Sequence, residues 1–289
     1  MKIVAYKINA FAKTEEGGNP AGVVLHADRL LEDEMKKIAG ILGFSETAFV
    51  MKSNTADYKV RFFTPTEEVD LCGHATIGTF SALLIKGHLK PGTYTQETKA
   101  GILTVEVKED ATIMMNQTLP QFCEIIDVEE VADSLNTSMT TIRKDLPVQI
   151  VSTGLRDILI PVKSMDILNG IKPDFDKITQ VSRKYKAVGY HLFCLESLNH
   201  SNAYCRNFAP LYHIPEESAT GTSNGALACY LLNHGVVSSD SCEHMIFEQG
   251  YSMNLPSEIV VSLGVAGNAI TEVKVGGKAF NLCEVDIEQ

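Results

Sequence analysis

Two short glycine-containing turns, each followed by an apolar helical run, constrain the fold of this chain more than any other feature. The first turn lies at 71–76 (LCGHAT), and its apolar run extends to Lys86. The second turn lies at 219–223 (ATGTS), and its apolar run extends to Leu232. Both runs are apolar nearly all round, which is typical of a helix that is buried on every side. We therefore expect each helix to be wrapped by its own sheet.

The segments around the two turns repeat one outline, which is strands, a long loop, the turn, its helix and more strands. In the first half, an amphipathic helix is expected at 30–42, and strands at 2–11, 21–25, 44–51, 58–63, 93–98, 102–108 and 111–115. In the second half, helices are expected at 128–135 and 174–185, and strands at 148–151, 157–162, 189–196, 203–208, 244–249, 258–263, 269–275 and 279–285.

This repetition predicts an α+β fold of two similar domains, each a rolled, mostly antiparallel sheet around a central helix. A chain of 289 residues is long enough for two domains of about 140 residues each. We expect the first domain at 1–120, which a C-terminal strand at 276–289 can complete, and the second at 121–275. Domains related by a pseudo-twofold axis would leave a cleft into which both helix N-termini point.

The formal net charge of −11 argues against nucleic-acid binding, because no basic stretch offsets it. The same charge repels small anions at long range, so a site for a carboxylated substrate needs local positive potential. Backbone N–H groups at helix N-termini supply such potential without lysine or arginine. We therefore expect the partner to be a small anionic metabolite that is bound at the two glycine turns.

The sequence gives no sign of membrane insertion, secretion or metal binding. No stretch approaches the ~20 apolar residues of a membrane helix, and the N-terminus is typical of a strand rather than a signal peptide. The seven cysteines form no CxxC pair, and the eight histidines form no HxH or HxxxH pair. We expect a cytoplasmic protein without a disulfide framework, a metal site or a membrane partner.

Short motifs, each common by chance, follow one another along most of the chain. They stand at 18–20 (GNP), 44–49 (FSETAF), 61–65 (RFFTP), 71–76 (LCGHAT), 151–157 (VSTGLRD), 206–210 (RNFAP), 219–222 (ATGT) and 248–250 (EQG). Their order and spacing resemble the phenazine-biosynthesis PhzF-like family, relatives of diaminopimelate epimerase. The resemblance implies the two-domain fold with an active site between the domains. It also implies a cofactor-independent isomerase that forms a homodimer.

The resemblance also implies roles for individual residues. In the family, the carboxylate of the Phe-Ser-Glu motif transfers the proton, which makes Glu46 the expected general base and acid. The family's Gly-His pair corresponds to Gly73 and His74. At the second turn the family commonly has Asp-Pro-x-Thr-Gly-Ser, whereas here Glu217 replaces the Asp and Thr222 replaces the final Ser. An acidic and a hydroxyl group remain, so the departure affects the substrate more than the reaction class.

The two candidate catalytic residues each have an ordinary structural alternative. Glu46 is either a partly buried carboxylate of the site or a solvated residue of a turn. His74 is either a hydrogen-bond partner and proton relay, or a first-turn helix residue that only bonds the backbone. The resemblance favours the catalytic role for both.

The candidate binding residues have alternatives of the same kind. Gly73, Gly221 and Thr222 either bind a substrate carboxylate through N–H and hydroxyl groups, or only form tight turns. Glu217 either binds a substrate amine or hydroxyl group, or is an acidic residue ahead of a helix that favours the helix dipole.

Cys72 helps to separate two types of reaction. The epimerase relatives use two cysteines, one at each turn, and Cys72 occupies the first of these positions. Thr220 occupies the second and cannot act as a thiolate, which argues against a two-thiol epimerase. We expect Cys72 to be buried and unreactive, and Arg156 to pair with a carboxylate.

The sequence therefore favours a cofactor-free isomerase that moves a proton between carbons of a small carboxylated, amino- or hydroxy-substituted metabolite. Its expected catalytic residues are Glu46 and His74, and its expected substrate-binding residues are Gly73, Glu217, Gly221 and Thr222. Two other classes stay open, an amino-acid epimerase of the same fold and a non-enzymatic metabolite-binding or partner protein.

Overall fold

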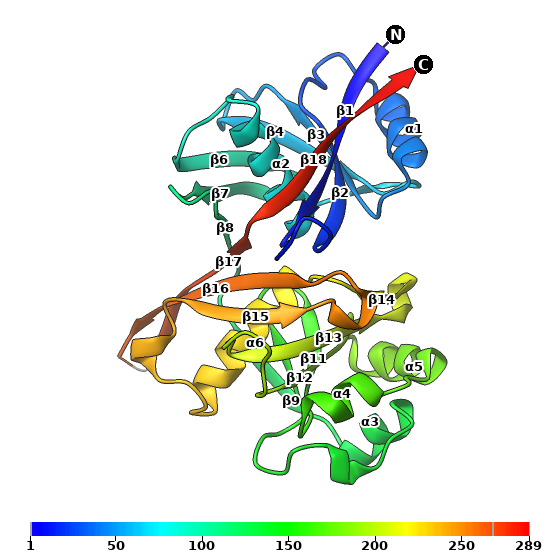
Figure 1. The fold of residues 1–289 in the computed structure, drawn as a ribbon, viewed down its shortest axis with the longest axis vertical. Coiled ribbons are helices and arrows are strands. Elements are labelled where there is room, and N and C mark those ends of the chain that lie inside the picture. The colour runs from blue at the N-terminus through cyan, green and yellow to red at the C-terminus, as the bar shows by residue number, and fades with distance from the viewer. Residues whose placement is uncertain (1, 268, 289) are drawn as a thin grey trace. The chain divides into compact units, whose positions relative to one another are not determined.

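The computed structural model describes residues 2–267 and 269–288, which divide into two compact units (Figure 1). Unit 1 holds the described residues of Met1–Asn116 and Gly276–Gln289, and unit 2 holds those of Gln117–Val275. Among the described residues, no helix is both long enough and apolar enough to cross a lipid bilayer.

Unit 1 consists of one sheet and two helices. Its helices are α1 (Glu32–Leu42) and α2 (Gly73–Ile85). Its strands are β1 (Lys2–Ala10), β2 (Asn19–Val24), β3 (Thr47–Met51), β4 (Tyr58–Phe63), β5 (Glu68–Val69), β6 (Gly92–Thr98), β7 (Gly101–Val107), β8 (Ile113–Asn116) and β18 (Ala279–Glu288).

The sheet of unit 1 is mostly antiparallel. β1 pairs antiparallel with β18 and with β2. β2 and β3 run parallel, and β3 and β4 run antiparallel. The other edge of β4 pairs with β5 in the antiparallel sense and with β6 in the parallel sense. β7 and β8 complete the sheet as antiparallel neighbours.

The helix α2 is the crossover that leads from β4 and β5 to β6. A parallel neighbour can be reached only through such a crossover, because a tight hairpin reverses the chain. α2 contacts β1, β2, β3, β8 and β18, so strands from the middle and from both ends of the sheet surround it (Figure 1). Every residue of α2 from His74 to Leu83 is buried. The helix is thus apolar on nearly every side because one curled sheet covers nearly every side of it.

Strand β3 and the end of strand β4 are buried on both faces, because α1 covers the face opposite to α2. Phe62 packs in a cluster with Ala75 of α2, whereas the next residue, Phe63, packs in a cluster with Met35 and Ile38 of α1. Successive side chains of a strand point to opposite faces, so both must be apolar when both faces are covered. This explains the continuous apolar run that ends β4.

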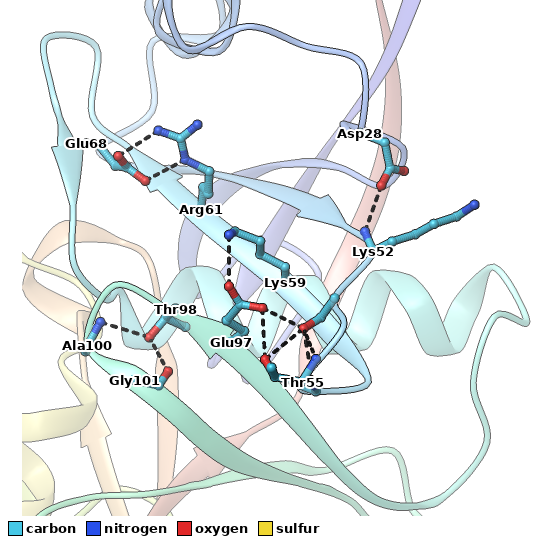
Figure 2. A network of polar contacts seen from close by, with 12 residues as sticks. Asp28, Lys52, Thr55, Lys59, Arg61, Glu68, Glu97, Thr98, Ala100 and Gly101 are labelled. Carbon is cyan, nitrogen blue, oxygen red and sulfur yellow. Dashed lines mark hydrogen bonds and ion pairs between the residues drawn. The ribbon is translucent and has the colours of Figure 1, made fainter.

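Charged side chains connect β4 to its neighbours β5 and β6 (Figure 2). Lys59 Nζ donates to Glu97 Oε1 at 2.8 Å across a directly opposed pair of β4 and β6. Arg61 donates to both carboxylate oxygens of Glu68, at 2.7 and 2.8 Å, and these hydrogen bonds hold the pKa of Glu68 below its usual range. Such bidentate pairs fix geometry as well as adding energy. They anchor β5, from which the chain enters the first glycine turn.

Unit 2 is built in the same way, with more helices. Its helices are α3 (Val128–Ser134), α4 (Met165–Gly170), α5 (Phe175–Tyr185) and α6 (Gly221–Asn233). Its strands are β9 (Gln121–Ile125), β10 (Gln149–Ser152), β11 (Arg156–Pro161), β12 (Gly189–Cys194), β13 (Ala203–Ala209), β14 (Ile214–Glu217), β15 (Met245–Gln249), β16 (Ser257–Ala266) and β17 (Ala269–Gly277).

The strand pairing of unit 2 follows that of unit 1 in order and sense. β10 pairs antiparallel with β9 and β11, β11 runs parallel to β12, and β12 runs antiparallel to β13. The other edge of β13 pairs antiparallel with β14 and parallel with β15, which is followed by antiparallel β16. The crossover before β15 is α6, which contacts β10, β11 and β16 and is buried from Ser223 to Leu231.

The helices predicted at 30–42, 128–135 and 174–185 are confirmed as α1, α3 and α5. The prediction missed β5, β9, β14 and α4, and it placed 44–46 in a strand, although β3 begins at Thr47. The missed elements are short, and β9 is a mostly exposed strand without apolar alternation. Their conformation depends on neighbouring strands and helices rather than on a local pattern.

We expect Gly78→Val to destabilise unit 1. A Cβ at Gly78 of α2 would lie 2.8 Å from Ile8 Cγ2 and 3.7 Å from Ala21 Cβ, on strands β1 and β2. Overpacking of such a buried contact lowers the free energy of unfolding by about 1–3 kcal/mol. Urea unfolding followed by circular dichroism measures the change.

The matched control is Gly40→Val in α1. Gly40 is exposed, and a Cβ there would have only the Pro65 carbonyl oxygen nearby, at 3.9 Å. The free energy of unfolding should stay within about 0.5 kcal/mol of wild type or rise slightly, because valine has a higher helix propensity than glycine. Equal losses in both variants would show that steric contact with Ile8 is not the cause.

Candidate active site

The first glycine turn places His74 at the start of the buried helix α2. Cys72 is the N-cap residue in an extended conformation, and Gly73 is the first residue of the helix. In the part of the chain that the structure describes, the Cys72 side chain makes no capping hydrogen bond to α2. The helix therefore begins without a side-chain cap, and its first backbone N–H groups suit an anionic group of a ligand.

The His74 ring lies among three polar side chains. Its Nε2 atom is 3.4 Å from Glu46 Oε2 and 3.4 Å from Ser45 Oγ. Its Nδ1 atom is 3.4 Å from Cys72 Sγ. His74 and Cys72 are buried, whereas Glu46 retains 20% of its side-chain exposure. The carboxylate is therefore accessible to a small molecule, while the ring behind it is shielded.

Glu46 is positioned by the join between α1 and β3. Gly43, in the left-handed conformation with φ 68°, ends α1 and turns the chain. The backbone carbonyl of Glu46 then accepts a hydrogen bond from Gly22 N at 3.1 Å, just before β3 begins at Thr47. A Cβ at Gly22 would lie 2.5 Å from Thr47 Oγ1, so only glycine allows β2 to approach this closely. These contacts fix the backbone of Glu46 and leave its carboxylate directed at His74.

A carboxylate beside an imidazole suits proton transfer. The Glu46–His74 distance of 3.4 Å is longer than a strong hydrogen bond, which is usual for catalytic groups before a substrate binds. A neutral His74 ring can donate to the carboxylate from Nε2, or accept from it when the carboxyl group is protonated. The pair can therefore hold a proton in either of two positions.

The second glycine turn forms a separate polar cluster in unit 2. Glu217 Oε2 accepts a hydrogen bond from Thr220 Oγ1 at 2.6 Å. Gln249 Oε1 accepts from Thr220 N at 3.2 Å and from Asn224 Nδ2 at 2.8 Å, and Gln249 Nε2 donates to the Glu217 carbonyl at 2.8 Å. The turn is thus held by side chains from β15 and from α6 itself. Gly221 follows as the first residue of α6.

Both central helices differ from the outer helices of unit 2 in how they begin. Like Cys72 at α2, the N-cap Thr220 makes no side-chain capping bond to α6 in the described structure. By contrast, Asp127, Ser164 and Asp174 cap α3, α4 and α5 through their side-chain oxygens. Side-chain capping is worth about 1 kcal/mol, and the described structure forgoes it at both central helices, as it does at α1, whose N-cap residue Leu31 makes no side-chain capping bond.

Asp157 is a buried acid on β11 that faces α6. Its Oδ2 atom accepts a hydrogen bond from Ser223 Oγ at 2.8 Å. Burial raises the pKa of Asp157 to about 7, the negative charge of Glu217 adds to the rise, and the Ser223 hydrogen bond opposes it. Asp157 therefore changes its charge near neutral pH, next to the first turn of α6.

His191 on β12 is buried behind the same turn. Its Nδ1 lies 3.0 Å from Asn207 Oδ1 and its Nε2 lies 3.3 Å from Asn224 Oδ1. Burial lowers the pKa of His191 to about 4, against the effect of these two hydrogen bonds, so the ring is neutral. Because the Asn224 amide nitrogen already donates to Thr220 and Gln249, its oxygen faces His191. This arrangement makes Nε2–H the donor to Asn224, so Nδ1 is the acceptor and the Asn207 amide group must turn its nitrogen toward the ring to donate to it.

The structure brings the residues predicted from the sequence together in two groups. Glu46 and His74 are in contact in unit 1, and Gly73 begins the same helix as His74. Glu217, Gly221 and Thr222 are half-buried neighbours at the second turn, where Thr153 Oγ1 donates to the Thr222 carbonyl at 3.1 Å.

Two expectations for individual side chains have clear outcomes. Arg156 pairs with a carboxylate, as predicted, since its Nη2 lies 2.8 Å from Glu124 Oε2. Cys72 is buried, as predicted, but its sulfur faces His74 rather than an apolar core alone. No local pattern in the sequence predicts that the thiol lies beside the imidazole.

The sequence interpretation assigned no role to the polar residues that support the second turn, although three of them stand in the motifs at 151–157, 206–210 and 248–250. Asp157, His191, Asn207 and Gln249 are all buried, and all lie on strands. Their signal is a polar or charged residue inside or at the end of an otherwise apolar strand run. Buried polar groups need partners, so such positions mark hydrogen-bond networks.

Known proteins resemble the chain along nearly all of its length. The family model of phenazine biosynthesis-like proteins, PhzC-PhzF, matches residues 8–284. An uncharacterized isomerase of Clostridium acetobutylicum is 37% identical over 284 residues, which cover 95% of this chain and 94% of that protein. The crystal structure of a PhzF-family phenazine biosynthesis protein of Bacillus anthracis matches with a TM-score of 0.90 and 33% identity over 100% of both chains.

A further relative carries a defined activity in its name. Trans-2,3-dihydro-3-hydroxyanthranilate isomerase of Pseudomonas fluorescens is 27% identical over 277 residues, which cover 93% of this chain and 94% of that protein.

The fold and these relatives define an isomerase with a mixed α/β fold. The chain belongs to the phenazine biosynthesis-like family, PhzC-PhzF. The family prediction from the motifs is therefore confirmed, and so is a mixed α/β fold. The pseudo-twofold relation of the domains and the roles of the site residues stay predictions.

We expect Asp157→Asn to change how stability depends on pH. Unfolded Asp157 ionises near its ordinary pKa of 3.8, but the folded protein keeps it protonated up to a pKa of about 7. The folded state thus binds more protons between these values, so the stability that protonated Asp157 provides is lost as pH rises through this window. Relative to Asp157→Asn, the wild type should lose up to about 4 kcal/mol of unfolding free energy between about pH 4 and about pH 8. Urea unfolding across this range measures the difference.

The comparison with Asp157→Asn isolates this carboxyl group from others that titrate, including His191, whose contribution has the opposite sign. The control is Asp240→Asn, on an exposed turn of unit 2. Its unfolding free energy should stay parallel to that of the wild type at every pH. If the unfolding free energies of the wild type and of Asp157→Asn stay parallel across this pH range, the raised pKa of Asp157 is contradicted.

Proposed function

We propose that this isomerase moves a proton between carbon atoms of a small carboxylated substrate that also carries an amino or hydroxy group. The reaction needs no cofactor in this proposal, because Glu46 both takes the proton and returns it. The observation that carries the proposal is the contact between Glu46 Oε2 and His74 Nε2, at 3.4 Å, in a chain of an isomerase family.

In the proposed reaction, the substrate regains at one carbon the proton that it loses at another, and its own conjugated system holds the electron pair in between. Glu46 takes a proton from one carbon of the substrate, and the electron pair of the broken C–H bond delocalises into the adjacent conjugated system. The same carboxylic acid then returns the proton to another carbon of that system, which shifts a double bond. His74 donates from Nε2 to the carboxylate while the carboxylate is ionised, and this orients the oxygen that reacts. The buried ring remains shielded from water, which strengthens the interaction.

The substrate class follows from the helix N-termini and from one relative. The uncapped N-terminus of α2 at Gly73 offers backbone N–H groups to a carboxylate. Glu217, Gly221 and Thr222 keep their proposed role in substrate binding, with the acidic group suited to an amine or hydroxyl group. The isomerase of Pseudomonas fluorescens acts, by its name, on a dihydro-hydroxyanthranilate, which has a carboxylate, an amine and a hydroxyl group. We propose a substrate with this combination of groups, and a homodimer as the working form.

An amino-acid epimerase of the same fold is the second candidate. Relatives of the diaminopimelate epimerase type use two cysteines, one at each glycine turn, and Cys72 occupies the first of these positions. The residue at the second turn is Thr220, whose hydroxyl group already donates to Glu217 at 2.6 Å. A hydroxyl group in this bond cannot serve as the thiolate that a two-cysteine mechanism needs at this position. We therefore place proton transfer on Glu46 rather than on residues 72 and 220.

Proton exchange in D₂O tests the proposal. We expect the wild type to incorporate deuterium at carbon into trans-2,3-dihydro-3-hydroxyanthranilate or a related carboxylated amine, as measured by NMR. Glu46→Gln should lower the exchange rate by about 10²–10⁴-fold, because general acid–base groups contribute effects of this size. Glu67→Gln, on an exposed loop of the same unit, should exchange at the wild-type rate.

The outcomes separate the three functional classes. If Glu46→Gln exchanges as fast as the wild type, Glu46 is not the base. Inversion at one carbon without movement of a double bond would indicate an epimerase. Ligand-induced thermal stabilisation without exchange for any compound would indicate a binding protein.

A further inference from the structure

Three side chains of unit 1 form a cluster that has the composition of a metal site. One ligand atom each from Glu46, Cys72 and His74 lies within 4.8 Å of the other two. The proposed proton transfer uses only Glu46 and His74, so the thiol of Cys72 has no part in it. The cluster as a whole combines a carboxylate, a thiol and an imidazole, the groups that bind zinc in proteins.

The distances in the cluster are close to those around a tetrahedral zinc ion. With zinc–ligand bonds of about 2.0–2.3 Å, neighbouring ligand atoms are separated by about 3.3–3.8 Å. His74 Nε2 is 3.4 Å from Glu46 Oε2 and 4.0 Å from Cys72 Sγ. Cys72 Sγ lies nearer the other ring nitrogen, Nδ1, at 3.4 Å, so binding of one ion requires the His74 and Cys72 side chains to turn until one ring nitrogen faces both the sulfur and the carboxylate.

The charges of the cluster favour a divalent ion. The Glu46 carboxylate and a Cys72 thiolate together balance the two positive charges of the metal, so a buried complex is neutral. Neutrality matters because His74 and Cys72 are 7% and 8% exposed, and an unbalanced buried charge is costly. The thiol and imidazole select zinc-like ions over Mg²⁺ or Ca²⁺, which prefer oxygen ligands only.

Glu46 provides the route by which an ion reaches the cluster. It is the most exposed member, at 20%, and its backbone is fixed by the bond to Gly22 while its carboxylate stays accessible. Among residues 2–267 and 269–288, the cluster offers three protein ligands, so a fourth position remains for water or for a ligand carboxylate. The uncapped N-terminus of α2 begins at Gly73, which lies between the ligands Cys72 and His74 in the sequence.

We propose that Glu46, Cys72 and His74 bind Zn²⁺, with release of the Cys72 thiol proton to solvent. Binding of the ion does not depend on the proposed function. One consequence does rest on that function, namely that bound Zn²⁺ blocks the isomerase, because it occupies the carboxylate oxygen and ring nitrogen that handle the proton. The protein is then an enzyme that zinc inhibits reversibly.

Titration with Co²⁺ as a spectroscopic substitute tests the binding site without any activity assay. The wild type should bind one ion per chain, with a thiolate-to-cobalt absorption in the near ultraviolet and visible bands typical of a four-coordinate ion. Zn²⁺ should displace the cobalt and remove both signals. Cys72→Ser and His74→Ala should each weaken Co²⁺ binding by at least about 100-fold. This exceeds the usual effect of removing a residue that only hydrogen-bonds a metal ligand, which is about 10- to 100-fold.

Cys283→Ser is the matched control, because Cys283 is an exposed cysteine of the same unit. It should bind Co²⁺ with wild-type affinity and give the same absorption. Circular dichroism and thermal unfolding of each variant in the absence of metal show whether it is folded. A wild type without thiolate-to-cobalt absorption, or a folded Cys72→Ser variant that retains it, would overturn the proposal.

The D₂O exchange assay tests the consequence separately. Zn²⁺ should stop exchange by the wild type, and a chelator should restore it. If Co²⁺ binds at the cluster but exchange is never observed, the metal site stands and the proposed isomerisation fails. If exchange proceeds at the wild-type rate with Zn²⁺ bound, the blocking role is wrong.

Discussion

The fold depends on the complete burial of two apolar helices, each of which is a crossover between parallel strands. β4 and β6 are parallel neighbours, so the chain between them must cross the sheet, and α2 does this on the inner face. Because α2 is apolar all round, one flat sheet cannot bury it. Strands from both ends of the sheet of unit 1 contact the helix, and in unit 2 the helix α6 contacts β10, β11 and β16.

Burial of a whole helix creates polar requirements, and these explain where the site lies. Inside α2, Thr76 and Thr79 donate to the carbonyls of Cys72 and Ala75, at 2.8 and 2.7 Å, and Thr76 Oγ1 also accepts from Gln96 Nε2 of β6 at 3.3 Å. The N-terminus is different, since its first N–H groups have no carbonyl partner within the helix. The sequence leaves this end without a side-chain cap and places His74 beside it. A ligand anion can therefore replace the cap.

The buried polar groups around the second turn lower the stability of the folded state, but they fix the position of the first turn of α6. Asp157 is raised to a pKa of about 7 by burial, and a neutral, buried His191 holds Asn224. Apolar side chains in these strands would pack without such costs. The network from Asn207 through His191 and Asn224 to Gln249 instead fixes the first turn of α6. The same Gln249 side chain donates to the Glu217 carbonyl, so the network also positions the backbone of Glu217.

The sequence by itself determined the two apolar helices, the glycine turns at their starts, and the family, because periodicity and motifs are local properties of the chain. It also singled out Glu46 and His74 as separate candidates. Only the tertiary structure decided that Glu46, Cys72 and His74 converge, since the parallel pairing of β2 and β3 places 46 next to a turn 26 residues away in sequence. Likewise, Asp157 and His191 gain partners only when β11 and β12 pack on α6. Contacts between distant segments depend on strand pairing, which no local pattern records.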